Sequence, residues 1–128
     1  MIIFSPGISA DWVYFGKEKT GYKHWYKNDN ILKNDNVVLV WEMNRRQSPN
    51  NNTQNKSPNH KITYRSSESY WEINCEEYQL KPLIQTFYKD PNWQNQLNHQ
   101  IKPIKNKLIP VQSIYSTLVD IVCEQQPL

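Results

Sequence analysis

Only two cysteines occur in this chain, and they lie in two different kinds of predicted element. Cys75 ends the alternating run 70–75, which has the period of a β-strand, and Cys123 lies in the last turn of the helix-like run 113–124. A bond between them would tie the terminal helix to a sheet and would place the chain in an oxidising compartment. Two free thiols in a cytosolic domain are the alternative, and the cysteines alone leave both open.

The first ten residues favour export. They contain a short apolar stretch, a Pro-Gly break and a small residue, Ala10, a pattern typical of the end of a secretory signal peptide cleaved before Asp11. The segment has no basic region and only about three apolar residues, which is too little for a complete signal peptide. We therefore expect Met1 to lie inside a longer signal. An ordinary first strand is the alternative. We therefore divide the chain into a residual signal-like segment, 1–10, and a single domain, 11–128.

Composition excludes several classes of protein. The hydrophobic fraction is 38% and the mean hydropathy is −0.83, so the core must be modest and must use the 5 Trp, 8 Tyr and 3 Phe. A net charge of +3, with scattered Lys and Arg, is too small to indicate nucleic-acid binding. The 3 glycines argue against nucleotide-binding loops, and no segment is long enough to span a membrane.

Short strands and one terminal helix account for most of the patterning. Turns are expected at residues 28–36 and 66–69, a polar loop at 47–60, and an edge position or a bulge at Pro82. Ser113 is the predicted N-cap of a helix with one apolar face, which must dock on the sheet because it is too short to be stable alone. The predicted strands are 12–15, 22–27, 37–44, 61–65, 70–75, 78–88 and a short one near 100–104.

No catalytic or metal-binding constellation is present in the sequence. The three histidines lie on separate segments at no metal-ligand spacing, and the two cysteines do not form a CxxC pair. No nucleophile motif occurs, and the pair Glu76-Glu77 is interpreted as solvated charge. We therefore predict that the chain is not an enzyme and holds no metal.

Aromatic side chains are the better indication of function, because Tyr and Trp are enriched where protein partners dock. We assign Trp12, Trp41 and Trp71 to the core and Trp93, which lies in a polar stretch, to the surface. The candidate binding residues are Trp25, Tyr26, Trp93, Tyr22 and His24. Tyr22 and His24 would share one face of a strand, which leaves haem as an alternative ligand.

The order of these features resembles the surface-adhesin protein E family, small exported proteins of Gram-negative bacteria. The resemblance runs from Trp12 to Cys123 and depends on the order of several short motifs rather than on any one of them. Asn28 and Asn74 stand where the family usually has Asp, and the Asn-rich loop 47–60 looks like an insertion. The motifs are Trp25-Tyr26, the Val-rich strand 37–41 ending in Trp, Glu72 to Cys75, Thr86 to Tyr88, and Pro110 to Cys123.

The resemblance implies an α+β fold, in which an antiparallel sheet of about six strands carries the C-terminal helix on one face and a Cys75–Cys123 disulfide joins the two. It also implies a non-enzymatic exported binding protein, in the periplasm or at the outer membrane and cell surface, in particular an adhesin with a protein partner. A homodimer and haem binding are associated with the namesake. A periplasmic ligand-binding or enzyme-inhibitor domain is the alternative function.

Overall fold

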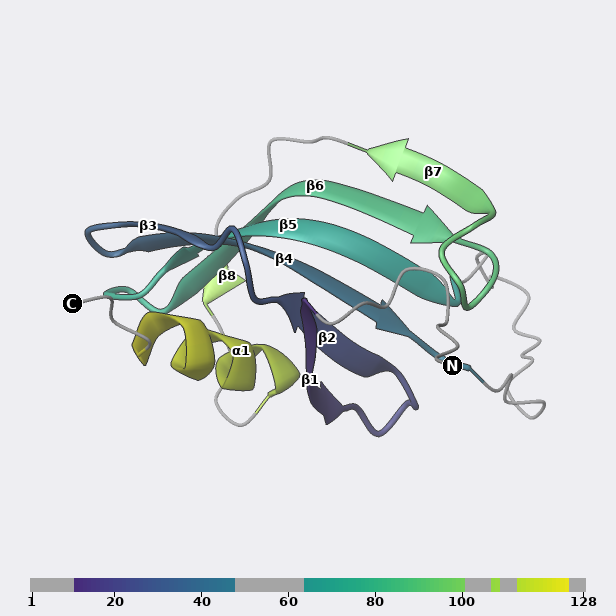
Figure 1. Cartoon of the computed structure of the whole chain (residues 1–128), viewed down its shortest axis with the longest axis horizontal. Helices are drawn as coiled ribbons and strands as arrows, with labels where there is room; N and C mark the ends of the chain where they lie inside the picture. Colours follow the sequence, from purple (N-terminus) through teal and green to yellow (C-terminus); the bar gives the residue numbers. More distant parts are fainter. Residues whose placement is uncertain (1–10, 48–63, 101–106, 109–112, 125–128) are drawn as a thin grey trace.

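The computed structural model describes residues 11–47, 64–100, 107–108 and 113–124. Within these ranges the chain forms one eight-stranded sheet and one helix (Figure 1). The elements are β1 (Trp12–Lys17), β2 (Lys23–Lys27), β3 (Leu32–Asn34), β4 (Val37–Arg45), β5 (Ser66–Asn74), β6 (Gln79–Tyr88), β7 (Gln96–Gln100), β8 (Lys107–Leu108) and α1 (Ile114–Glu124).

All strand pairs in the described sheet are antiparallel, and its continuous path runs β1-β2-β4-β5-β6-β7. The two short strands lie off this path, with β3 paired to β4 and β8 to β6. One edge of β4 is therefore shared, because β2 pairs with its last residues and β3 with its first. Helix α1 lies under the sheet (Figure 1), as an α+β layer fold requires.

Strand β4 separates the two faces of the sheet. Val38 and Val40 belong to the core between the sheet and α1, so strand alternation places Leu39 and Trp41 on the opposite face. The buried core also contains Tyr26, Trp71, Ile73, Leu80, Leu118, Val119 and Val122. The core therefore occupies a single layer between the sheet and the helix.

Helix α1 begins and docks as its sequence predicts. The Ser113 hydroxyl accepts a hydrogen bond from the Ser116 backbone N–H at 3.1 Å, which is the N-cap contact. The helix buries Leu118 and Val122 against the sheet. Cys123, in its last turn, is joined to Cys75 by a disulfide. The predicted α+β architecture and disulfide are thus confirmed.

Two predictions about the strands need correction. Residues 66–69 are not a turn but the first half of β5, where backbone pairing and hydrogen bonds satisfy the buried serines: Ser67 Oγ accepts from Asn44 Nδ2 at 2.9 Å. The segment 31–36 contains strand β3, which its polar composition concealed. The bulge predicted at Pro82 is present, because Pro82 pairs with Trp71 while Ile84 pairs with Tyr70.

Other predictions fall partly beyond the described residues. Strand β7 ends at Gln100, where the predicted strand 100–104 begins, and residues 101–104 lie outside the described ranges. The same holds for 48–60 of the polar loop, for 61–63 of the predicted strand 61–65, and for the signal-like segment 1–10.

Candidate functional site

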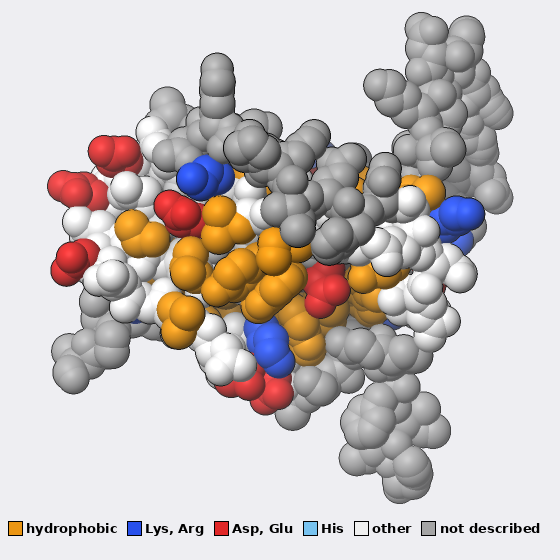
Figure 2. Space-filling view, turned by 90° about the horizontal axis from the view of Figure 1, so that it is seen from above, with side chains coloured by type: hydrophobic (Ala, Val, Ile, Leu, Met, Phe, Trp, Pro, Cys, Tyr) orange, Lys and Arg blue, Asp and Glu red, His pale blue; other side chains and the backbone are white. Residues whose placement is uncertain are grey.

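The face of the sheet opposite α1 carries a continuous set of apolar and aromatic side chains, which we call the uncovered face. Within the described ranges, no helix packs against it. Figure 2 looks onto this face and shows hydrophobic side chains gathered across its middle. Strand alternation and pairing place the following residues on it: Tyr14, Leu32, Val37, Leu39, Trp41, Tyr70 and Ile84.

A stacked pair lies at the centre of this face. Trp41 on β4 and Tyr70 on β5 are cross-strand partners, and their ring centroids are 4.7 Å apart with nearly parallel planes. Both side chains remain partly exposed. Tyr14 is 50% exposed and Leu32 is 55% exposed, so the apolar surface extends to both ends of the sheet. Contiguous apolar surface of this kind marks interaction sites on soluble proteins.

A second aromatic cluster lies beside the stacked pair. The Arg45 guanidinium is 5.4 Å from the ring centroids of both Trp25 and Trp93, which meet edge to face at 6.2 Å. Tyr14 packs edge-on against Trp25 at 5.7 Å. The cluster covers Trp25, which is only 9% exposed, so Trp93, Arg45 and Tyr14 form its outer surface.

A short loop holds Trp93 in place. The Asp90 carboxylate accepts hydrogen bonds from the backbone N–H groups of Asn92, Gln94 and Asn95 at 2.9, 3.0 and 2.6 Å. Burial would raise the pKa of Asp90, but these backbone hydrogen bonds outweigh it and lower the pKa below its usual value. The Trp93 indole N–H donates to the Ser67 carbonyl at 3.0 Å. The position of Trp93 is therefore fixed before any partner arrives.

The opposite face holds a buried polar network around Glu42. His24 is 1% exposed and Glu42 is fully buried. The His24 ring donates through Nδ1 to Glu42 at 2.6 Å and through Nε2 to Glu18 at 2.5 Å. Glu42 also accepts from the Trp71 indole at 2.9 Å and from Asn44 Nδ2 at 3.0 Å. The buried carboxylate is thus satisfied by donors from three strands.

Two carboxylates can both accept from one imidazole only when the ring carries both protons. Burial alone would lower the pKa of His24, but its hydrogen bonds to Glu42 and Glu18 and their negative charges raise it. Both ring nitrogens of His24 are engaged by carboxylates, and neither is free to bind a metal. Within the described residues, no group of three or more metal-ligating side chains occurs.

The structure brings together only some of the candidate binding residues. Trp25 and Trp93 meet on the uncovered face, whereas Tyr26 and His24 lie on the side of the sheet that faces α1. Tyr22 lies just before β2, where its hydroxyl donates to the Tyr64 carbonyl at 2.5 Å.

Sequence reasoning missed other residues of the face. Trp41 was assigned to the core and instead lies on the uncovered face, while the assignment of Trp71 to the core is correct. Arg45 was also not among the candidate binding residues, and its guanidinium lies against two indole rings. Alternation places Trp41 and Arg45 on the same face of β4, but the sequence alone does not show which face the helix covers.

The fold and these two faces define a class: a small disulfide-bonded antiparallel sheet with a helix on one side and an aromatic surface on the other. The sequence matches the family of surface-adhesin protein E over residues 12–124. The chain therefore belongs to the surface-adhesin protein E family.

Solved structures of Haemophilus influenzae protein E share the fold. One superposes with a TM-score of 0.54 at 15% identity and covers 94% of this chain and 90% of that chain. A second crystal form gives a TM-score of 0.55 at 14% identity, with 94% of each chain covered. The selenomethionine form gives 0.54 at 19% identity, with 98% and 95% covered. No curated protein sequence matches the chain.

The helix described here, α1, is too short and too polar to cross a membrane.

Proposed function

We propose that this chain is an exported, non-enzymatic binding protein, in particular a surface adhesin, that docks a protein partner through its uncovered face. The single observation that carries the proposal is the aromatic surface around Trp41 and Tyr70, which the described elements leave without a covering layer. Membership of the adhesin family supports the role, and the disulfide supports a life in an oxidising compartment.

The physical reason lies in how protein interfaces gain affinity. Trp, Tyr and Arg anchors supply most of the binding energy, and anchors fixed in advance lose little conformational entropy on binding. Trp93 and Arg45 are held by the Asp90 loop and by ring contacts, and Trp41 is held by Tyr70. The Glu42–His24 pair, by contrast, is buried: the Glu42 side chain is fully buried and His24 is 1% exposed.

The test is binding of the purified mature domain to immobilised basement-membrane matrix, with Trp41→Lys as the disabling variant. Thr117→Lys is the matched control, because Thr117 is exposed on α1 and the variant adds the same charge on the opposite side. We expect Trp41→Lys to weaken binding about tenfold or more, and Thr117→Lys to leave it unchanged. Equal binding by both variants would refute the proposal.

Location requires a separate experiment on the native cell. Labelling of intact cells with a membrane-impermeant reagent should modify the exposed Lys23, since an adhesin must be outside the outer membrane. Labelling that needs an opened outer membrane would place the chain in the periplasm and would refute adhesion. Sedimentation of the wild type and of Trp41→Lys distinguishes a foreign partner from a second copy of the chain.

A further inference from the structure

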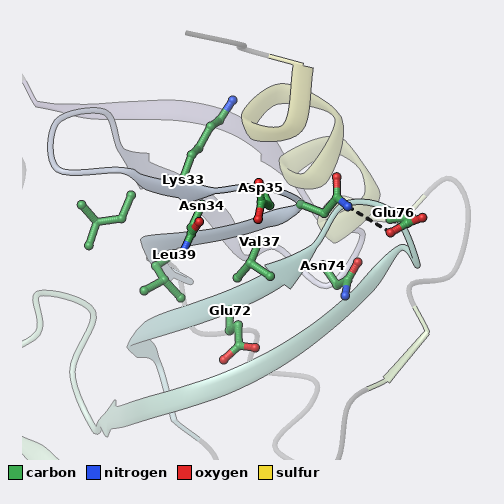
Figure 3. Close-up of a pocket in the computed structure, with 10 residues that line it drawn as sticks. Lys33, Asn34, Asp35, Val37, Leu39, Glu72, Asn74 and Glu76 are labelled. Carbon is green, nitrogen blue, oxygen red and sulfur yellow. Dashed lines mark hydrogen bonds between the residues drawn. The ribbon is translucent and has the colours of Figure 1, made fainter.

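A shallow groove of about 670 Å³ lies at the end of the uncovered face, beside β3 and β5 (Figure 3). Its apolar floor consists of Leu32, Val37 and Leu39, which belong to two adjacent strands, with Leu32 paired directly to Leu39. Leu32 is among the most exposed large apolar side chains of the described residues. The floor continues the aromatic surface toward the β3–β4 turn.

The rim of this groove is acidic although the chain as a whole is basic. Asp35, Glu72 and Glu76 line it, against a net charge of +3 for the whole sequence. Lys33 is the lysine among the lining residues, but it is the cross-strand partner of Val38, whose side chain faces the helix. Its side chain therefore points to the helix side of the sheet and not into the groove. Figure 3 accordingly shows Lys33 extending away from Val37 and Leu39.

These carboxylates make only weak contacts within the described part of the chain, so they can still bind a cation. Glu72 and Lys81 approach only to 3.9 Å, and both are about one third exposed. Glu76 accepts one hydrogen bond, from Asn36 Nδ2 at 3.0 Å. Asp35 forms no ion pair with any residue that the structure describes. A cation arriving at the rim would therefore displace little.

We infer that this groove binds a segment of the protein partner that combines lysine or arginine with aliphatic side chains. Such a side chain has an apolar stem that would cover Leu32 and Leu39, and a cationic head that would reach Glu72 and Glu76. An anionic surface, such as a nucleic acid or an acidic polysaccharide, would meet the carboxylates and be repelled. The inference deepens the proposed function and rests on it, because it names the chemistry of the partner at one end of the same face.

The test uses short synthetic peptides of alternating lysine and leucine, with fluorescence anisotropy as the readout. Two comparison peptides replace lysine by glutamine or by glutamate. We expect the lysine peptide to bind best and the glutamate peptide worst, with affinity falling as salt screens the rim charges. Equal affinity for the lysine and glutamine peptides would overturn the inference.

Two variants locate the site, and one serves as control. Glu76→Lys reverses a rim charge and should weaken binding about fivefold or more, and Leu32→Ser should weaken it at every salt concentration. Asp120→Lys is the control, because Asp120 is an exposed carboxylate on α1 that also accepts a single hydrogen bond, from the Tyr78 hydroxyl at 3.3 Å. A Glu76→Lys affinity equal to that of Asp120→Lys would overturn the inference.

The remaining occupants are excluded by two further measurements. Peptide binding that appears only after residues 1–10 are deleted would mean that the chain fills its own groove. Self-association that Glu76→Lys abolishes would mean that a second copy fills it. Either result overturns the inference. If Trp41→Lys abolishes matrix binding but Glu76→Lys leaves peptide binding unchanged, this inference alone is refuted. If the wild type does not bind matrix but binds the peptide in a way that depends on Glu76, only the proposal of adhesion is refuted.

Discussion

Removing the Cys75–Cys123 disulfide should lower the free energy of unfolding of this domain, and the length of the loop that the bond closes sets the size of the loss. The bond closes a loop of 48 residues. The chain-entropy relation for a loop of this length gives about 4 kcal/mol of stabilisation, which comes mainly from restricting the unfolded chain. For a domain whose whole stability is about 5–15 kcal/mol, this is a large fraction.

The same figure converts to a melting temperature. An unfolding entropy of about 2.1 cal/mol/K per residue, over 128 residues, makes a loss of 4 kcal/mol equal to a fall in Tm of about 15 °C. The assay is guanidinium unfolding followed by tryptophan fluorescence, since Trp71 is buried in the core. The Cys75→Ala, Cys123→Ala and double variants are compared with the reduced wild type.

The four species should lose nearly equal stability, because each loses the same covalent link. The native spectra should be unchanged, because helix α1 keeps its buried contacts through Leu118 and Val122. Single-variant losses that add up in the double variant would show that side-chain burial, and not the link, carries the effect. A loss below about 1 kcal/mol would refute the entropic reasoning altogether.

Three further predictions concern the two polar clusters. The folded pKa of His24 is raised above 6.5, so its contribution to stability should be complete below about pH 6.5 and lost as the pH rises through the folded pKa. In urea unfolding curves measured at a series of pH values, Glu42→Gln should reduce this loss of stability. A wild-type stability that rises over the same pH range would contradict the prediction. Haem titration should give no Soret change that depends on His24, because both ring nitrogens bind carboxylates; a shift abolished by His24→Ala would contradict the geometry. Asp90→Ala should speed amide exchange at Gln94 and Asn95 and expose Trp93 to acrylamide quenching. Since the pKa of Asp90 is lowered in the folded protein, the wild-type loop should loosen in the same way only as the pH falls through this lowered pKa. Equal quenching of wild type and variant at neutral pH would mean that Asp90 does not hold the loop.

Some elements of this fold could be predicted from local sequence because their signals are strong and self-contained. The β-branched run that starts at Val37 has few alternatives to a central strand. The helix 114–124 has a cap and one apolar face, and two cysteines allow only one intramolecular pairing.

The face on which Trp41 lies was harder to predict, for a physical reason. Residues 37–41 are apolar on both sides of the strand, so apolar and polar side chains do not alternate there, and the sequence does not indicate which side the helix covers. The serines at 66–69 have turn propensity, and only their pairing with β4 and β6 makes a strand of them.

The buried network could not be found from the sequence at all. Glu42 is a single acidic residue in a strand, and nothing near it in the chain indicates burial. Its donors and neighbours come from residues 18–24, 44, 71 and 115, and they converge only after β2, β4, β5 and α1 have assembled. Convergence of this kind is a tertiary property with no short-range pattern.

This network explains how a face that it never touches keeps its shape. A slip of one residue in β4 would move Glu42 onto the uncovered face and would turn Trp41 toward the helix. The buried His24 ring and the Trp71 indole N–H would then lose their acceptor. Each buried group left unsatisfied costs about 1–3 kcal/mol, so the network selects a single register. Glu42→Ala should therefore weaken partner binding only as far as it unfolds the domain, whereas Trp41→Lys should weaken binding in molecules that remain folded. Binding measured at equal folded fraction separates the two effects, and a Glu42→Ala defect that persists after this correction would mean that the network acts on the face by another route.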